Sequence, residues 1–233
     1  MVAKAMIEEA LRYIGMPQKK YQLEHEGNIV WSREEMIEKV EQGFKKLEQI
    51  AIPRVLYQRL SVNKTDEEVT LEGTLCKIKS RDLVKLLAHS KSCVIMAATL
   101  GPEVDRQIGL RQRMDMLDAL VLDVCASVLI DKICDDVEME LVKELSELDY
   151  LTMRFSPGYG DVPLEASGDF LDILMAPKKI GLSLTKSQML VPTKSITAII
   201  GISDRKENRQ KSCGTCNLVK TCAYRKRGEQ CGL

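Results

Sequence analysis

The feature that most constrains this fold is a long run with helical propensity and apolar side chains around much of its circumference. It reads LDALVLDVCASVLIDKICDDVEMELVKEL, and Pro102 suits the first turn of the helical stretch that leads into it. A helix that is apolar on most sides must be covered by other elements. We therefore predict that the chain is helical from Pro102 to about Leu148 and that this helix is the buried spine of the protein.

Three polar residues interrupt the apolar surface of this helix. Asp123, Ser127 and Asp131 are four residues apart and fall on nearly the same face. Two interpretations stay open: the stripe faces solvent or caps a neighbouring loop, or it lines a cleft.

The remaining sequence predicts further helices and paired strands. Ser32 and Glu35 form a capping-box pattern at the start of a second helix, after a first helix over residues 3–14. Strands are predicted at PRVLYQRLSVN, EEVTLEGTLCKI and CVIMAATLG, and two more around a Val191-Pro192 turn. Short helices are predicted at SRDLVKLLAHS and at GDFLDILMA, the latter ended by Pro177. The pattern indicates an α+β fold.

Composition restricts the class of protein. The chain has 233 residues, 45% of them hydrophobic, which suffices for a core, and Lys+Arg and Asp+Glu are both 34. The zero net charge and the 4% aromatic content argue against nucleic acid as a partner. No window resembles a signal peptide or a membrane span, so we expect a soluble, cytoplasmic protein without a membrane partner.

The apolar periodicity ends after Ser203, and four of the eight cysteines follow. We predict one domain over residues 1–203, with residues 1–30 as an N-terminal helical extension, and a cysteine-rich, metal-binding tail over residues 204–233. The tail cysteines have the spacing Cys-x2-Cys-x5-Cys-x8-Cys: Cys213, Cys216, Cys222 and Cys231. Four thiolates this close in sequence can enclose one metal centre.

The identity of that centre stays open. Zinc would close the tail structurally, whereas an iron–sulfur cluster would add electron transfer, and the spacing matches none of the common ferredoxin runs. Reduced or disulfide-forming thiols are a further alternative. Because the tail is locally basic, a nucleic-acid-binding zinc ribbon and a solvated basic loop are also alternatives. The other cysteines lie among apolar neighbours and are predicted to be buried core thiols: Cys76, Cys93, Cys125 and Cys134.

The stretch MRFSPGYGDVP, from Met153 to Pro163, follows the long helix and predicts a tight turn. Pro157 fixes its own φ and Gly158 tolerates a positive φ, so backbone N–H and C=O groups are exposed there. Arg154 offers a planar donor fork for a carboxylate, and Tyr159 offers a ring that can lie against a flat ligand. The turn is therefore a candidate binding site for a molecule resembling an amino acid or a nucleoside.

Taken in order, three segments make the chain resemble the activation (reactivation) domain of vitamin B12-dependent methionine synthase. These are the long helix with LGPEVDRQI at its head, RFSPGYG at residues 154–160, and IGLSLTKSQMLVPTKSITAIIGI at residues 180–202. The resemblance covers roughly residues 30–203. It implies a C-shaped domain with a twisted antiparallel sheet and long helices.

In that family the domain binds S-adenosylmethionine, whose methyl group remethylates the corrinoid after its reduction. The resemblance implies that Arg154 pairs with the methionine carboxylate of this ligand. It also implies that the backbone of Ser156, Pro157 and Gly158 hydrogen-bonds the ligand and that Tyr159 lies near the corrinoid. The ammonium contact stays open, because the family's acidic residue near Ser127 is missing, and its substitute could be one of Asp123, Asp131, Glu147 and Asp149.

The chain has no Asp-x-His-x-x-Gly corrinoid motif, so we expect another polypeptide to carry the cobalamin. That partner would be a methionine synthase lacking its own activation domain or a corrinoid methyltransferase, with a flavodoxin or a ferredoxin as electron donor. No side chain stands out as a nucleophile or a general acid-base pair, so the resemblance implies a methyltransferase component that positions its cofactors. The alternative is a non-catalytic redox or docking partner of a corrinoid protein, with electrons carried by a four-cysteine iron–sulfur cluster.

Overall fold

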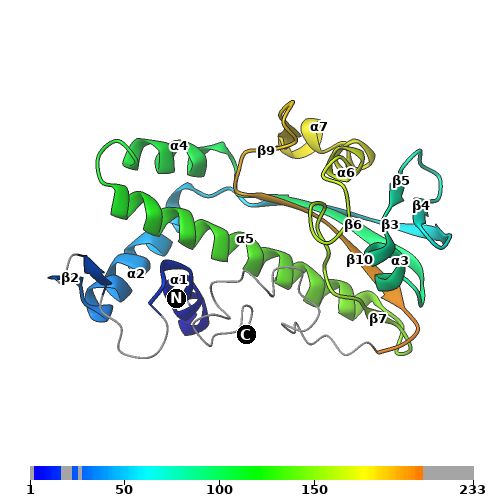
Figure 1. Cartoon of the computed structure of the whole chain (residues 1–233), viewed down its shortest axis with the longest axis horizontal. Coiled ribbons are helices and arrows are strands. Elements are labelled where there is room, and N and C mark those ends of the chain that lie inside the picture. Colours follow the sequence, from blue (N-terminus) through cyan, green and yellow to red (C-terminus); the bar gives the residue numbers. More distant parts are fainter. Residues whose placement is uncertain (1–2, 17–22, 26–27, 207–233) are drawn as a thin grey trace. The chain divides into compact units, whose positions relative to one another are not determined.

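The computed structural model describes residues 3–16, 23–25 and 28–206 of the chain (Figure 1). Their Cα positions group into two compact units. Of the described residues, unit 1 comprises those up to Gln58, Met96–Lys143 and Ser167–Thr197, and unit 2 comprises Arg59–Ile95, Glu144–Ala166 and those from Ala198 to residue 206. The predicted architecture of helices with an antiparallel sheet is confirmed.

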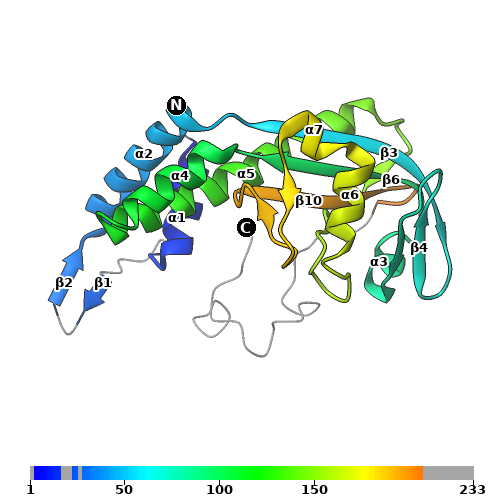
Figure 2. The same ribbon diagram turned by 90° about the horizontal axis from the view of Figure 1, so that it is seen from above.

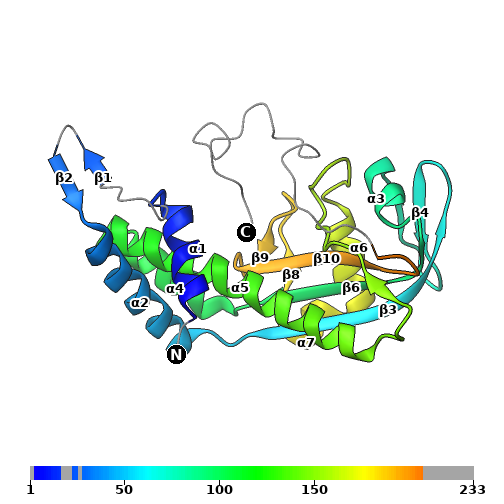
Figure 3. The same cartoon turned by 90° about the horizontal axis from the view of Figure 1, so that it is seen from below.

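A six-stranded sheet has the strand order β5-β4-β3-β6-β10-β7. Its members are β3 (Arg54–Lys64), β4 (Glu68–Leu71), β5 (Lys77–Lys79), β6 (Ser90–Thr99), β7 (Tyr150–Leu151) and β10 (Ser195–Ser203). Strands β3, β6 and β10 have residues in both units. Figure 3 shows β6 and β10 side by side, as the strand order requires. Nearly every residue of these two strands is buried, as predicted for CVIMAATLG.

Helices dominate unit 1. They are α1 (Lys4–Ile14), α2 (Arg33–Ile50), α4 (Pro102–Arg111), α5 (Met116–Glu144), α6 (Ala166–Leu174) and α7 (Ala176–Ile180). The capping box predicted at the start of α2 is present, with the Glu35 N–H donating to the Ser32 hydroxyl at 3.1 Å. Helix α1 packs against α2, and α2 approaches α5 where Gly43 faces the Cys125 thiol. None of the helices in the described part of the chain is both long and apolar enough to cross a membrane.

The described residues of unit 2 contain β4, β5, β7 and the short helix α3 (Arg81–Leu86), which packs against β4. The antiparallel pairing predicted between PRVLYQRLSVN (β3) and EEVTLEGTLCKI (β4) is confirmed, with Val62 opposite Leu71. The predicted strand EEVTLEGTLCKI is two strands, because Gly73 has a positive φ of 76° and reverses the chain between β4 and β5. Two short strand pairs lie outside the sheet: β1 (Leu23–His25) with β2 (Asn28–Trp31), and β8 (Ser183–Leu184) with β9 (Leu190–Val191).

Two predicted helix boundaries are wrong. The helical stretch from Pro102 is interrupted between α4 and α5, because the Asp115 carboxylate accepts the Leu117 and Asp118 N–H groups and starts a new helix. Pro177 does not end a helix. The chain turns at Met175, whose φ is 53°, and Pro177 then lies in the first turn of α7 (Figure 2).

The four cysteines predicted to be core thiols are buried. Burial raises the pKa of Cys93 to about 12, with the neighbouring Cys76 adding to the shift, and burial also raises the pKa of Cys125 to about 12. Both groups are therefore protonated thiols at neutral pH.

We predict that Cys93 and Cys125 resist alkylation in the native protein at pH 8, because the thiolate is the reactive species and burial suppresses it. Alkylation followed by peptide mass spectrometry would measure this, with the protein unfolded in urea as the control. The unfolded chain ionises these thiols near the ordinary pKa of 9.0, whereas the folded chain does so only near 12. Stability should therefore fall as the pH rises from 9 toward 12. Rapid native labelling of either thiol would contradict the prediction.

Candidate functional site

The predicted turn begins where the chain leaves the sheet beside β10. Phe155 forms an isolated antiparallel bridge with Ile199, in which each N–H donates to the other residue's carbonyl, at 2.9 and 2.8 Å. Three residues earlier, the Thr152 N–H donates to the Gly201 carbonyl at 2.8 Å, and the Gly201 N–H donates to the Thr152 hydroxyl at 2.7 Å. A side chain thus replaces one ladder carbonyl, and the segment between these anchors need not follow a regular strand.

The turn itself is closed by backbone hydrogen bonds. The Gly158 N–H donates to the Val162 carbonyl at 2.9 Å, and the Tyr159 N–H donates to the Ser156 carbonyl at 3.1 Å. Gly158 has a φ of 89°, which confirms the positive φ predicted there, and Gly160 also has a positive φ, of 56°. A Cβ on Gly158 would lie 2.7 Å from Leu164 Cδ2, so the Leu164 side chain would have to move to admit one.

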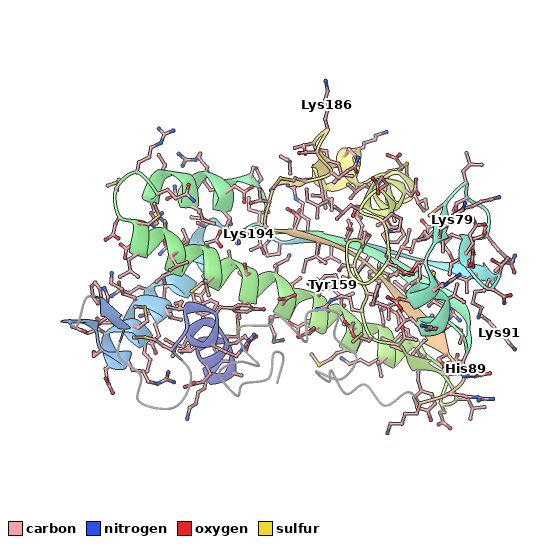
Figure 4. The ribbon with its side chains drawn as sticks, in the orientation of Figure 1. Lys79, His89, Lys91, Tyr159, Lys186 and Lys194 are labelled. Carbon is pink, nitrogen blue, oxygen red and sulfur yellow. The ribbon has the colours of Figure 1, made fainter. Side chains whose placement is uncertain are left out.

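Exposure differs along the turn. Pro157 is buried, Arg154 and Ser156 are half-buried, and Tyr159 is 67% exposed. The Tyr159 ring stands edge-on to the Phe155 ring, with centroids 6.4 Å apart. Phe155, which is fixed to Ile199, therefore supports the Tyr159 ring from one side. Figure 4 labels Tyr159 on this turn. The structure therefore brings the five predicted ligand-binding residues together on one turn: Arg154, Ser156, Pro157, Gly158 and Tyr159.

A carboxylate that the sequence analysis did not select anchors the far end of the turn. Asp161 accepts hydrogen bonds from the Ser80 hydroxyl, from the Arg81 N–H at 2.8 Å and from the Asp82 N–H at 3.2 Å, all at the start of α3. Burial alone would raise the pKa of Asp161, but these hydrogen bonds outweigh it and hold the pKa below its ordinary value. The carboxylate is therefore ionised at neutral pH.

The polar stripe on α5 holds a lysine within unit 1. The Lys194 ammonium lies 2.9 Å from Asp123 Oδ1 and donates to the Ser127 hydroxyl at 2.9 Å (Figure 4). Asp105, on α4, fixes the residue before Lys194 by accepting from the Thr193 N–H at 2.6 Å. Asp123, one of the residues considered for a ligand ammonium, is thus already paired with a cation of its own chain.

Two other candidates for the contact with the ligand's ammonium group, Glu147 and Asp149, follow α5 in unit 2. Asp149 accepts a hydrogen bond from the Ser146 hydroxyl at 2.9 Å, and Glu147 is exposed. No sequence signal pointed to Asp161 or Lys194, because their partners are far away along the chain. Ser80 is different, since its place before a helical run is a recognisable N-cap.

The predicted metal ligands lie outside the described residues: Cys213, Cys216, Cys222 and Cys231. Within residues 3–16, 23–25 and 28–206, no group of three or more His, Cys, Asp and Glu side chains is arranged to hold a metal ion.

Residues 133–229 match the family model described as "Vitamin B12 dependent methionine synthase, activation domain". The resemblance predicted from the sequence is confirmed. The match begins within α5 and contains the whole turn from Arg154 to Gly160, as well as β10. It continues beyond Ser203 and includes three of the tail cysteines, Cys213, Cys216 and Cys222.

A solved structure shares the fold. It is described as "Crystal Structure of the MetH Reactivation Domain bound to AdoHcy", and it matches with a TM-score of 0.57 and 15% sequence identity. The match covers 73% of this chain and 65% of that chain, so this protein spans about two thirds of the MetH domain's length. None of the curated proteins matches the chain significantly. At 15% identity the structural match establishes the activation-domain fold alone.

We predict that Gly160→Ala destabilises the protein more than Gly73→Ala. Both glycines have a positive φ, so an added Cβ costs each about 1–2 kcal/mol of backbone strain. Only at Gly160 would the Cβ also meet other atoms, lying 2.5 Å from Asp82 Oδ2 and 3.2 Å from Phe155 Cζ, whereas nothing lies within 4 Å at Gly73. Urea unfolding of the two variants measures the difference. Equal losses of unfolding free energy would show that the turn does not pack closely on α3.

Proposed function

We propose that this protein binds S-adenosylmethionine at the Arg154–Tyr159 turn and supports reductive remethylation of a corrinoid carried by another polypeptide. The observation that carries the proposal is the family match over residues 133–229, because that stretch contains the entire turn. The ligand of the MetH structure, AdoHcy, is what S-adenosylmethionine becomes after it donates its methyl group. A fold shared with that domain supports a ligand of the same class.

The residues of the turn fit this ligand in charge and in access. The Arg154 guanidinium can donate two parallel N–H bonds to a carboxylate, and its half-buried position would strengthen such a pair relative to one in open water. Gly158 is exposed and carries no side chain, so its backbone is accessible to a ligand. Tyr159 is sufficiently exposed to lie against a flat macrocycle presented by a partner.

Hydrogen bonding within the turn limits which peptide groups the ligand can use. The Gly158 N–H and the Ser156 carbonyl are already paired with Val162 and Tyr159. In the described part of the chain, the turn's own backbone bonds use neither the Ser156 N–H nor the Pro157 and Gly158 carbonyls. We propose that these three groups bind the ligand.

When bound, S-adenosylmethionine supplies the activated methyl group, and the partner's corrinoid receives it. The contribution of this chain is to hold the donor in one orientation and to shield it from water on one side. This role requires no nucleophile from the chain. A flavodoxin or a ferredoxin would supply the electron, and the partner would be a methionine synthase or a corrinoid methyltransferase.

The first test is calorimetric titration of the purified protein with S-adenosylmethionine. Arg154→Ala should weaken binding roughly tenfold to a hundredfold, because hydrogen bonds to a charged group contribute about 1.5–3 kcal/mol. Arg106→Ala is the matched control, since Arg106 is exposed on α4 and pairs with Glu103. Absence of binding by the unaltered protein would contradict the proposal, and unchanged affinity of Arg154→Ala would contradict the assigned pocket.

The second candidate function is a redox or docking partner of a corrinoid protein, and the observation that favours it is the presence of four cysteines within nineteen residues of the tail. Here the four thiolates of Cys213, Cys216, Cys222 and Cys231 would hold an iron–sulfur cluster, and the turn would bind no ligand. The titration separates the two functions, because only the first requires S-adenosylmethionine.

We predict that protein purified without oxygen contains a metal bound by the tail. Analysis of iron, sulfide and zinc, together with the visible spectrum, identifies the centre. A double substitution, Cys213→Ser with Cys216→Ser, should remove the metal, because it leaves two of four thiolates. Cys76→Ala, at a buried core position, is the control and should leave the metal content unchanged. Zinc without iron or sulfide would exclude the electron-transfer function.

A further inference from the structure

Three donors converge on one carboxylate at the surface of unit 2. They are the Ser80 hydroxyl and the backbone N–H groups of Arg81 and Asp82, and all of them point to Asp161, about 80 residues later in the sequence. A helix start leaves several N–H groups without a partner inside the helix, and here the turn at residues 156–162 satisfies two of them. The contact is therefore specific in both geometry and charge.

The start of α3 is fixed independently of this turn. The Ser80 hydroxyl accepts from the Leu83 N–H at 2.9 Å, and the Ser80 N–H donates to the Glu67 carbonyl at 2.9 Å. The Arg81 guanidinium pairs with the Glu67 carboxylate. Because Glu67 immediately precedes β4, the helix start is tied to the sheet and offers Asp161 a fixed base.

On the side of the turn, Asp161 is flanked by two constrained residues. Gly160 packs so closely on α3 that a Cβ would lie 2.5 Å from Asp82 Oδ2. Val162 is buried, and its carbonyl accepts the Gly158 N–H that closes the turn. A displacement of Asp161 would therefore be transmitted to Gly158 within a few covalent bonds.

We infer that Asp161 is a positioning residue, which holds the Arg154–Tyr159 turn on the start of α3 and so sets the place of Gly158 and Tyr159 for the ligand. The identity of the ligand rests on the proposed function, whereas the attachment of the turn to α3 does not. Asp161 itself touches neither ligand nor corrinoid in this scheme. It acts through the backbone of the turn.

The experiment compares Asp161→Ala, Asp161→Asn and the unaltered protein by hydrogen-deuterium exchange and by titration with S-adenosylmethionine. Alanine removes every acceptor, so exchange should accelerate at least tenfold both in residues 156–163 and at the start of α3. The affinity should fall roughly tenfold, because the ligand must then order a turn that Asp161 no longer holds in place. Asparagine keeps one acceptor oxygen and should restore part of both losses.

Asp66→Ala is the matched control, because Asp66 is an exposed carboxylate in the β3–β4 connection of the same unit. It should change neither exchange in the turn nor affinity. If Asp161→Ala does not fold, Ser80→Ala replaces it. That variant removes the hydroxyl donor and leaves both N–H donors, but it also removes the acceptor of the Leu83 N–H. The measurement is therefore exchange in residues 156–163 alone, where a smaller acceleration is expected.

The two readouts separate this inference from the proposed function. If the unaltered protein does not bind S-adenosylmethionine, the proposed function is wrong, and exchange alone decides whether Asp161 holds the turn. Unchanged exchange in the turn of Asp161→Ala would overturn the inference. So would accelerated exchange with unchanged affinity, because the turn's position would then not matter to the ligand.

Discussion

Strand β10 is buried along nearly its whole length, so each of its N–H and C=O groups needs a partner within the protein. Strand β6 lies on one side of it, and β7 covers only its last residues on the other. The segment after β7 supplies the missing partners through Thr152 and Phe155. A Cβ on Gly201 would lie 2.5 Å from Ser90 Oγ, so glycine is also needed for this close approach. The need to complete the sheet therefore determines where the turn begins.

Local patterns in the sequence predicted the parts of the fold that depend on neighbours along the chain. The capping box of α2 and the buried strand β6 are examples, since a cap spans three residues and a buried strand is a continuous apolar run. Pairs distant in the sequence were beyond this reasoning. Asp161 reaches Ser80 and Lys194 reaches Asp123, and nothing beside any of these residues identifies its partner. The turn was recognised because its prolines and glycines are local signals, but its attachment to α3 was not.

Two of the buried cysteines serve packing rather than thiol chemistry. Cys125 fills space beside Gly43 at the contact of α2 with α5, and its thiol donates to the Val40 carbonyl at 3.6 Å. Cys93 is enclosed in β6, and a pKa near 12 keeps both thiols protonated and weakly nucleophilic. These positions require a small apolar side chain rather than thiol chemistry. Cys93 and Cys125 therefore take no part in thiolate chemistry at neutral pH.

The turn is held from both ends by different forces. Phe155 is fixed by two backbone hydrogen bonds to Ile199, and Asp161 is fixed by its charge at the start of α3. Only five residues lie between these anchors, and backbone bonds inside the turn order them further. A ligand that binds such a segment loses little affinity to ordering it, since its conformational entropy was already lost on folding. The stiffness of the turn is thus consistent with a site that holds a reactive methyl donor in one orientation while Tyr159 stays exposed to a partner.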